Sequence, residues 1–159
     1  MKQHFYKTTI TWEGNKGEGT RSYTSYSRDH SIIAENKPAI AASSDPAFRG
    51  DASRYNPEEL FLASLSSCHM LWYLHLCAVN GVVVSEYSDH AVGEMAENPD
   101  GSGQFTHVTL HPRVTVSEPG MVDKACSLHA DARAMCFIAR SVNFPVHHLP
   151  EVSCYEKTF

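Results

Sequence analysis

The alternation of apolar and polar side chains at the start of the chain predicts β-structure. In Gln3–Trp12, successive side chains would point to opposite faces of a strand, and both faces contain β-branched or aromatic residues, which is typical of a strand. We expect a second strand over Thr20–Arg28 and a short third one around Ile32–Ile33. The segment Lys37–Tyr55 has no such period, so we expect a long ordered loop there.

A helical period occupies the middle of the chain. Asn56 and Pro57 are residue types that begin helices, and Glu59 stands where a capping box requires an acid. Gly81 predicts the end of the helix. Between these signals, apolar side chains recur at steps of three and four residues and cover nearly the whole circumference. The sequence therefore predicts one long central helix.

The second half of the chain predicts a hairpin, a helix and a last strand. Val82–Met95 and Gln104–Val116 are expected strands, and Asn98–Gly101 is the turn between them. Apolar positions over Val122–Ser141 follow helical spacing, and Glu151–Thr158 is the expected final strand. The predicted order of elements is therefore strands, helix, two strands, helix, strand.

Length and charge narrow the class of protein further. The chain has 159 residues, which fits a single domain over residues 1–159. Its formal net charge is −5 and it has no run of basic residues, so we do not expect nucleic-acid binding. No secretory signal opens the sequence, so a cytoplasmic location is expected.

One stretch has the length of a membrane span. Residues 60–79 contain no Asp, Glu, Lys or Arg. Serine and histidine residues interrupt the stretch, however, and no basic flank would orient an insertion. We therefore expect a buried helix, partly in an oligomer interface, and no membrane contact.

The five cysteines suggest redox chemistry. Their number is odd and no CxxC pair exists, which disfavours a disulfide framework. Cys68 and Cys136 lie on the two predicted helices among small residues, so the helices could bring their thiols within disulfide range. In a reducing compartment, such a pair points to catalysis more than to structure. We interpret Cys77, Cys126 and Cys154 as packing residues.

A thiol peroxidase also needs a cation near the thiolate and a carboxylate that orients this cation. The candidate carboxylates are Glu58 and Glu59, and the candidate cations are Arg49 and Arg54.

A metal site is a weaker alternative. Its ligands would be Cys68, His69, His75 and Cys77. His69 and His75 are six residues apart, so they point to different sides of a helix, unlike a helical metal pair four residues apart. No metal, haem or flavin is expected.

Two segments resemble the OsmC/Ohr family of organic hydroperoxide reductases. The run Asn56–Cys68, NPEELFLASLSSC, looks like the signature that contains the first family cysteine, and Ala134–Val142 occupies the place of the second. The resemblance implies an α+β fold in which two central helices are flanked by curved, mostly antiparallel sheets, in an intertwined homodimer. The chain departs from the family pattern at His69, His75 and His129.

The resemblance also implies residue roles. Cys68 would attack the peroxide, Cys136 would resolve the product, and Glu58 would orient an arginine, for which Arg49 is the first choice. The alternative arginines are Arg21, Arg28 and Arg54. Because ten residues of unbroken helix would separate Glu58 from Cys68 by about 15 Å, the two cannot touch directly. Either the helix breaks, or Arg49 spans part of the gap, or the two residues meet across a dimer, which we prefer.

The implied function is reduction of organic hydroperoxides with electrons from a lipoyl-type or other dithiol. The alternative is a non-enzymatic module of the same fold that binds a small molecule or senses redox state.

Overall fold

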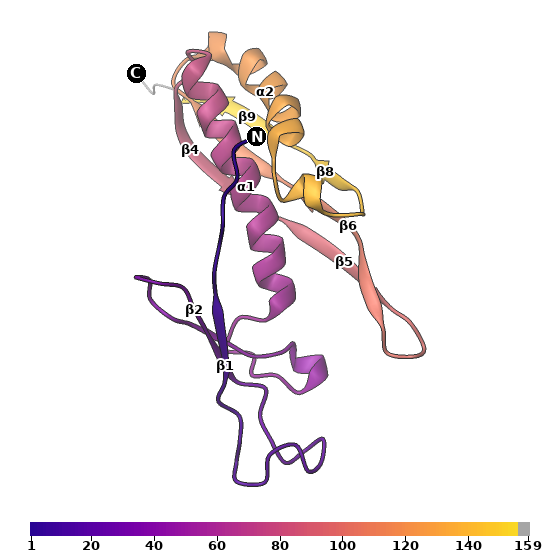
Figure 1. Ribbon diagram of the computed structural model, residues 1–159. Coiled ribbons are helices and arrows are strands. Elements are labelled where there is room, and N and C mark those ends of the chain that lie inside the picture. Colours follow the sequence, from indigo (N-terminus) through magenta and orange to yellow (C-terminus); the bar gives the residue numbers. More distant parts are fainter. Residues whose placement is uncertain (156–159) are drawn as a thin grey trace. The chain divides into compact units, whose positions relative to one another are not determined.

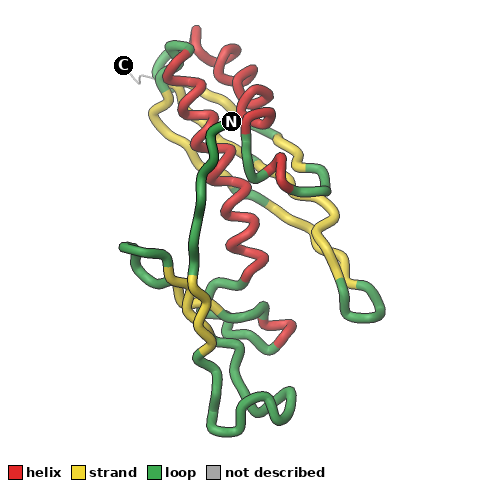
Figure 2. Tube along the Cα trace, viewed as in Figure 1, coloured by secondary structure: helices red, strands yellow, loops and turns green. Residues whose placement is uncertain are grey.

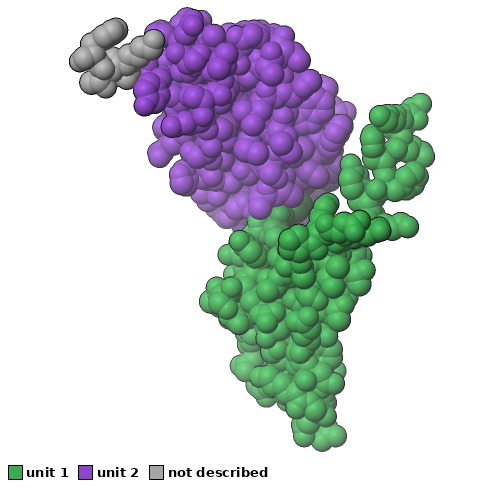
Figure 3. Space-filling model, turned by 90° about the vertical axis from the view of Figure 1, so that its left-hand side faces the viewer, with its two compact units in different colours: residues 1–61 green, residues 62–159 purple. Residues whose placement is uncertain are grey.

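The computed structural model describes residues 1–155, which divide into two compact units, residues 1–61 and the part of the chain that follows (Figure 3). Two long helices and three sheets of three strands each make up the described chain (Figure 1). Antiparallel pairs predominate in the sheets. The prediction of an α+β fold is therefore confirmed.

The first unit contains one small antiparallel sheet in the order β1-β2-β3. Its strands are β1 (Thr9–Trp12), β2 (His30–Ile33) and β3 (Ile40–Ala42), and a short 3-10 helix, η1, follows over Pro46–Phe48. Most of this unit is loop and turn (Figure 2). The predicted loop over Lys37–Tyr55 is therefore partly wrong, because β3 pairs with β2 through its backbone.

The predicted strand over Thr20–Arg28 is wrong. This segment forms turns, in which the Ser25 hydroxyl donates to the carbonyl oxygens of Gly19 and Ser22, both at 2.9 Å. The Arg28 side chain donates to the carbonyl oxygens of Tyr23 and Tyr26. Local bonds from side chains to the backbone compete here with strand pairing.

The first unit buries very little apolar surface. Apart from Gly14, its buried residues are Ala42, Ser43 and Asn56. Large apolar side chains stay exposed, among them Phe5 at 83%. Residues 1–61 therefore contain no hydrophobic core of their own.

Helix α1 runs without a break over Pro57–Val79 and begins as the sequence predicts. The Asn56 side chain accepts a hydrogen bond from the Glu59 N–H at 2.8 Å, and the Glu59 carboxylate accepts one from the Asn56 N–H at 3.1 Å. These reciprocal bonds form the expected capping box. Gly81 follows the helix with φ +73°, a left-handed conformation that favours glycine. The alternative of a broken helix between Glu58 and Cys68 is therefore wrong.

By length and composition α1 could cross a membrane. Four of its side chains are nevertheless buried within the fold, two of them polar: Leu65, His69, Tyr73 and Cys77.

The two predicted strands after α1 each split into two strands that belong to different sheets. The first divides into β4 (Val84–Asp89) and β5 (Val92–Glu97), and the second into β6 (Gly103–Leu110) and β7 (Pro112–Val116). One sheet has the order β4-β7-β9 and the other β5-β6-β8. The turn at Asn98–Gly101 is confirmed, since the Asn98 N–H donates to the Ser102 carbonyl at 2.7 Å.

A 3-10 helix, η2 (Pro119–Met121), leads into helix α2 (Val122–Met135), which ends earlier than expected. Cys136 caps α2 in an extended conformation, and a separate 3-10 turn, η3, follows over Ala139–Ser141. The Arg140 side chain donates to the carbonyl oxygen of Ala134 at 3.3 Å, which caps the helix end. The prediction that Cys136 lies inside a long helix is therefore wrong.

Two strands close the described chain, each parallel to its neighbour. Strand β8 (Val146–His148), which the sequence did not predict, pairs with β6, and β9 (Glu151–Cys154) pairs with β7. The predicted end of the last strand, residues 156–158, lies outside the described residues.

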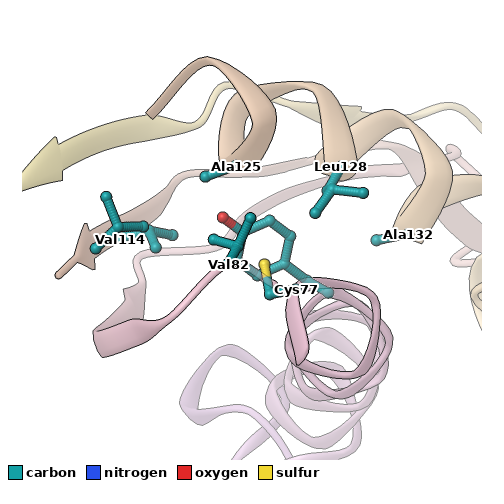
Figure 4. Close-up of a cluster of buried hydrophobic side chains, with 8 residues drawn as sticks. Cys77, Val82, Val114, Ala125, Leu128 and Ala132 are labelled. Atoms are coloured by element: carbon teal, nitrogen blue, oxygen red, sulfur yellow. The ribbon is translucent and has the colours of Figure 1, made fainter. Parts of the chain in front are cut away.

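The core of the second unit joins both helices to β7. Ala125, Leu128 and Ala132 point from α2 toward Cys77 and Val82 (Figure 4). All five are buried, and the short alanine side chains allow α2 to pack closely over the core. This packing sets the positions of the two helices and therefore of the polar side chains that they carry.

Candidate functional site

Cys68 and Cys136 form a pair of free thiols within the second unit. Cys68 lies in the middle of α1, and Cys136 is the first residue past α2. Their thiols lie close enough to interact, because Cys68 contributes to the raised pKa of Cys136. The structure thus brings together the two cysteines that the sequence analysis singled out.

The two thiols differ in environment. Cys136 is 1% exposed, whereas Cys68 is partly exposed. Burial, together with the neighbouring Cys68 thiol, raises the pKa of Cys136 to about 11. Cys136 therefore stays protonated at neutral pH. Of the two, Cys68 is the one that solvent and a substrate can reach.

The chain turn after α2 fixes the position of Cys136. The backbone N–H of Ala139 donates to Cys136 Sγ at 3.4 Å, and the N–H of Arg140 donates to the Cys136 carbonyl at 3.0 Å. The position of the Cys136 thiol is therefore set by the loop that follows α2, and not by a continuous helix.

An apolar hollow of about 240 Å³ lies on α1, lined by Leu71, Trp72 and His75. These residues follow Cys68 by three, four and seven positions, so they share its face of the helix. The Trp72 ring also contacts the Phe137 ring edge to face at 5.6 Å. Apolar surface thus lies within two turns of the exposed thiol.

Glu58 is half-buried in the first turn of α1. Because Glu59 closes the capping box, the Glu58 carboxylate remains available, and its buried Oε2 atom has no hydrogen-bond partner. A buried carboxylate oxygen is usually paired, so this position calls for a cation.

Arg49 ends η1 in a left-handed conformation with φ +66°, which is uncommon for a residue with a side chain. A Cβ atom on Gly50 would lie 1.5 Å from the Ser44 carbonyl oxygen, so the loop requires glycine there. The Arg49 guanidinium lies 5.8 Å from the centre of the Tyr23 ring. Among the described residues it forms no ion pair.

The alternative arginines are already engaged within the first unit. Arg21 pairs with Glu18 at 3.6 Å. Arg28 stacks on two tyrosine rings, at 4.4 and 4.2 Å from their centres. Arg54 pairs with Glu13 and Asp51, at 3.8 and 3.9 Å. Arg49 is therefore the freest of the four.

Sequence reasoning missed a buried cluster of three histidines from α1, α2 and β8. His69 Nε2 lies 3.0 Å from His129 Nδ1, and the centres of the His69 and His148 rings are 4.3 Å apart. Tyr73 stacks on His129 with ring centres at 3.9 Å. The spacing of His69 and Tyr73 places both on the buried stripe of α1, but no signal in the sequence brings His129 and His148 to them.

Burial lowers the pKa of all three histidines. The pKa falls from 6.5 to about 3 for His69 and to about 4 for His129, with further lowering from the neighbouring imidazoles. For His148 it falls to about 4, with Arg133 as the second cause. The cluster is therefore neutral at pH 7.

Within the described chain, no three His, Cys, Asp or Glu side chains converge on a point that could hold a metal ion. The His69 and His129 rings are nearly coplanar, at 12°, and their close nitrogens face each other, which is the geometry of a hydrogen bond. The free nitrogens lie at the far ends of the pair and point apart.

Comparisons with known proteins place this chain in a family. The family described as OsmC-like protein matches residues 50–148. A solved OsmC-like protein of unknown function from Vibrio cholerae is 32% identical, with a TM-score of 0.82 over 94% of this chain and 99% of that one. Comparison with curated proteins found no match.

Two more distant structures share the fold. An organic hydroperoxide resistance protein from Elizabethkingia anophelis is 16% identical, with a TM-score of 0.70 over 97% of this chain and 99% of that one. An organic hydroperoxide resistance protein from Legionella pneumophila is 18% identical, with a TM-score of 0.66 over 95% and 99%. From the matched family and the 32% identical structure, we conclude that the chain belongs to the OsmC-like protein family.

Proposed function

We propose that this protein is a cysteine-based thiol peroxidase that reduces organic hydroperoxides. The observation that carries the proposal is the pair of neighbouring free thiols, one buried and protonated, the other partly exposed. Two distant structures of the same fold are named organic hydroperoxide resistance proteins, which agrees with this chemistry.

The first step makes a sulfenic acid. The Cys68 thiolate attacks the terminal oxygen of the hydroperoxide, the O–O bond breaks, and the alkoxide leaves and takes up a proton to become the alcohol. Sulfur is oxidised by two electrons and the peroxide is reduced by two. The apolar hollow beside Cys68 gives the organic part of the substrate a place to lie.

The second step forms a disulfide. The Cys136 sulfur attacks the Cys68 sulfenic sulfur, the S–O bond breaks, and the hydroxyl leaves as water with the Cys136 proton. A dithiol, of the lipoyl type or another, then reopens the disulfide by thiol exchange. In sum, two thiols and one hydroperoxide give a disulfide, an alcohol and water, and no bound cofactor takes part.

In this proposal Glu58 orients the arginine that stabilises the Cys68 thiolate. The unpartnered carboxylate oxygen of Glu58 and the absence of an ion pair at Arg49 among the described residues support these two roles. We further propose a cytoplasmic homodimer of one domain per chain. Its interface would cover the apolar side chains that α1 exposes, such as Leu71 at 63% and Val79 at 64%.

The test is a comparison of Cys68→Ser and Cys136→Ser with the wild type, using cumene hydroperoxide and hydrogen peroxide. Wild type should lose two thiols per organic peroxide and yield a Cys68–Cys136 disulfide by mass spectrometry. Cys68→Ser should consume none. Cys136→Ser should reduce about one peroxide per subunit and keep a sulfenic acid on Cys68 that dimedone traps.

Cys126→Ser is the matched control, because Cys126 is an exposed thiol and its loss should leave turnover unchanged. A dimedone adduct on Cys126 or Cys154, or unchanged cycling of Cys136→Ser, would refute the assigned roles. If wild type consumes no thiols with either peroxide, the protein is a binding or sensing module of this fold instead.

A further inference from the structure

The three histidines of the buried cluster have unusual hydrogen bonding. His69 Nδ1, His129 Nε2 and both ring nitrogens of His148 are buried with no hydrogen-bond partner. Buried polar atoms are normally paired, since an unpaired one costs about 1–3 kcal/mol. The cluster is therefore a destabilising feature within the core of the second unit, and it has no part in the proposed peroxidase chemistry.

The bond between His69 and His129 depends on the protonation state of the pair. One nitrogen must carry the proton and the other must offer a lone pair across their 3.0 Å separation. A first added proton places a positive charge between two side chains that are 0% and 3% exposed. A second removes the acceptor and sets two cations against each other.

The charged side chains around the cluster offset such a charge only weakly. The titratable or charged neighbours of the cluster are Tyr73 on α1, Tyr87 and Asp89 on β4, Arg133 on α2 and His147 on β8. Burial keeps both tyrosines protonated by raising the pKa of each phenol. Arg133 and His147 disfavour a proton on His148.

Asp89 is the one acid among these neighbours, and its two oxygens are occupied. The Ser66 hydroxyl donates to one at 2.5 Å, and the His111 N–H donates to the other at 2.7 Å. Asp89 favours a proton on His148 only weakly, behind burial and Arg133. A proton taken up by the cluster thus has no counter-ion in place, and exposure to water is what would stabilise it.

The same two segments of chain hold the thiol pair. Cys68 immediately precedes His69 on α1, and His129 lies seven residues, or about two turns, before Cys136. Both side-chain pairs, one of thiols and one of imidazoles, therefore link α1 to α2 and its cap. Movement of the end of α2 away from α1 would open both.

We propose that the His69–His129 pair is an acid-sensitive latch, which holds Cys136 against Cys68 while it is neutral and releases the end of α2 when it takes up protons. The Cys68–Cys136 disulfide, once formed, holds the same latch shut. This proposal rests on the proposed function in one respect: it takes Cys68 and Cys136 as the two thiols that peroxide oxidises.

Linkage makes the coupling reciprocal. If the disulfide favours the closed latch, the oxidised protein must open at a lower pH than the reduced protein, and acid must in turn favour the dithiol. A resting, reduced molecule would stop forming its disulfide in acid, whereas a molecule already oxidised would keep its structure.

The experiment follows Trp72, whose ring contacts Phe137 next to Cys136. The chain has two tryptophans, so Trp12→Phe leaves Trp72 as the sole reporter. Its fluorescence is recorded from pH 7 to pH 3 in the reduced full-length protein and after oxidation with diamide. Diamide closes the disulfide without peroxide, so a failed peroxidase and a failed latch give different results.

We expect the reduced protein to open between pH 6 and pH 4, and the oxidised protein at least half a pH unit lower, as an order of magnitude from the histidine reference pKa of about 6.5. His69→Gln/His129→Gln, which cannot take up protons at these sites, should open at least about one pH unit lower than its parent. His90→Gln is the matched control, because His90 is exposed in the same unit, and it should change nothing.

Equal opening pH in the parent and the double variant would overturn the latch. Equal opening pH in the reduced and oxidised proteins, or failure of diamide to join Cys68 to Cys136, would overturn its coupling to the thiols. If the double variant does not fold at pH 7, the single variant His129→Gln is held to the same comparison. Hydrogen exchange of residues 132–141 in the wild type provides a second readout, with faster exchange expected below pH 5.

Discussion

The buried histidines make the stability of this protein depend steeply on pH. The pKa of His69 is about 3 and that of His129 about 4 in the folded chain, against 6.5 for an exposed imidazole. Below pH 6.5 the unfolded chain binds protons that the folded chain does not, so acid favours unfolding. The stabilisation is complete above about pH 7 and is lost as the pH falls through 6.5 toward 4.

The size of the effect follows from these values. A pH of 5 is about one and a half units below the pKa of an unfolded imidazole, and each unit changes the free energy of unfolding by about 1.4 kcal/mol. His69 and His129 then each lower the free energy of unfolding by about 2 kcal/mol relative to pH 7, or by about 4 kcal/mol together. His148 is less buried, but its pKa also falls to about 4, so it adds to this loss. Since domains are stable by about 5–15 kcal/mol, the loss is large.

Urea denaturation at pH 7 and pH 5, at one fixed protein concentration, measures this difference. Wild type and His90→Gln should lose at least about 4 kcal/mol of unfolding free energy, and His69→Gln/His129→Gln should lose about 4 kcal/mol less than wild type, because only His148 of the cluster still takes up a proton on unfolding. The lowered pKa values of Asp51 and Asp100 affect a more acidic range and do not contribute at pH 5. A wild-type loss below about 1 kcal/mol would refute the reasoning.

Three further predictions concern assembly, the thiolate and the helix cap. Light scattering should give twice the chain mass of 17.7 kDa, and a monomer at micromolar concentration would contradict the dimer. Arg49→Ala should slow alkylation of Cys68 at pH 7, measured by mass spectrometry of its peptide. An unchanged rate would transfer the role to another arginine: Arg21, Arg28 or Arg54. Asn56→Ala should lower the unfolding free energy by about 1 kcal/mol, because the capping bond to Glu59 is lost; a change below about 0.3 kcal/mol would contradict the cap.

The parts of the fold that the sequence predicts correctly depend on local signals. The start of α1 is fixed by residues within four positions of Asn56, and the Asn98–Gly101 turn by its own four residues. The division of each long strand between two sheets depends on partners far away in the sequence, and alternation continues on both sides of each division. A prediction from alternation alone therefore treats each of these pairs of strands as a single strand.

The candidate site shows the same limit. The residues alone left the pairing of Cys68 with Cys136 open, and only the family resemblance supplied it as an expectation. His69, His129 and His148 are separated by 60 and 19 residues, and only the packing of α1, α2 and β8 brings them together. No local pattern marks a histidine that will meet two others in a core.

The lack of a core in residues 1–61 has a consequence for how the protein is made. The ribosome releases this segment first, with Phe5, Tyr6 and Ile10 exposed even in the finished fold. Such a segment cannot collapse while it waits for the rest of the chain. Residues 62–155, in contrast, can condense around Tyr73 and Leu128 as soon as they emerge. Residues 1–61 therefore leave the ribosome without a core of their own, and their exposed apolar side chains favour aggregation of the nascent chain.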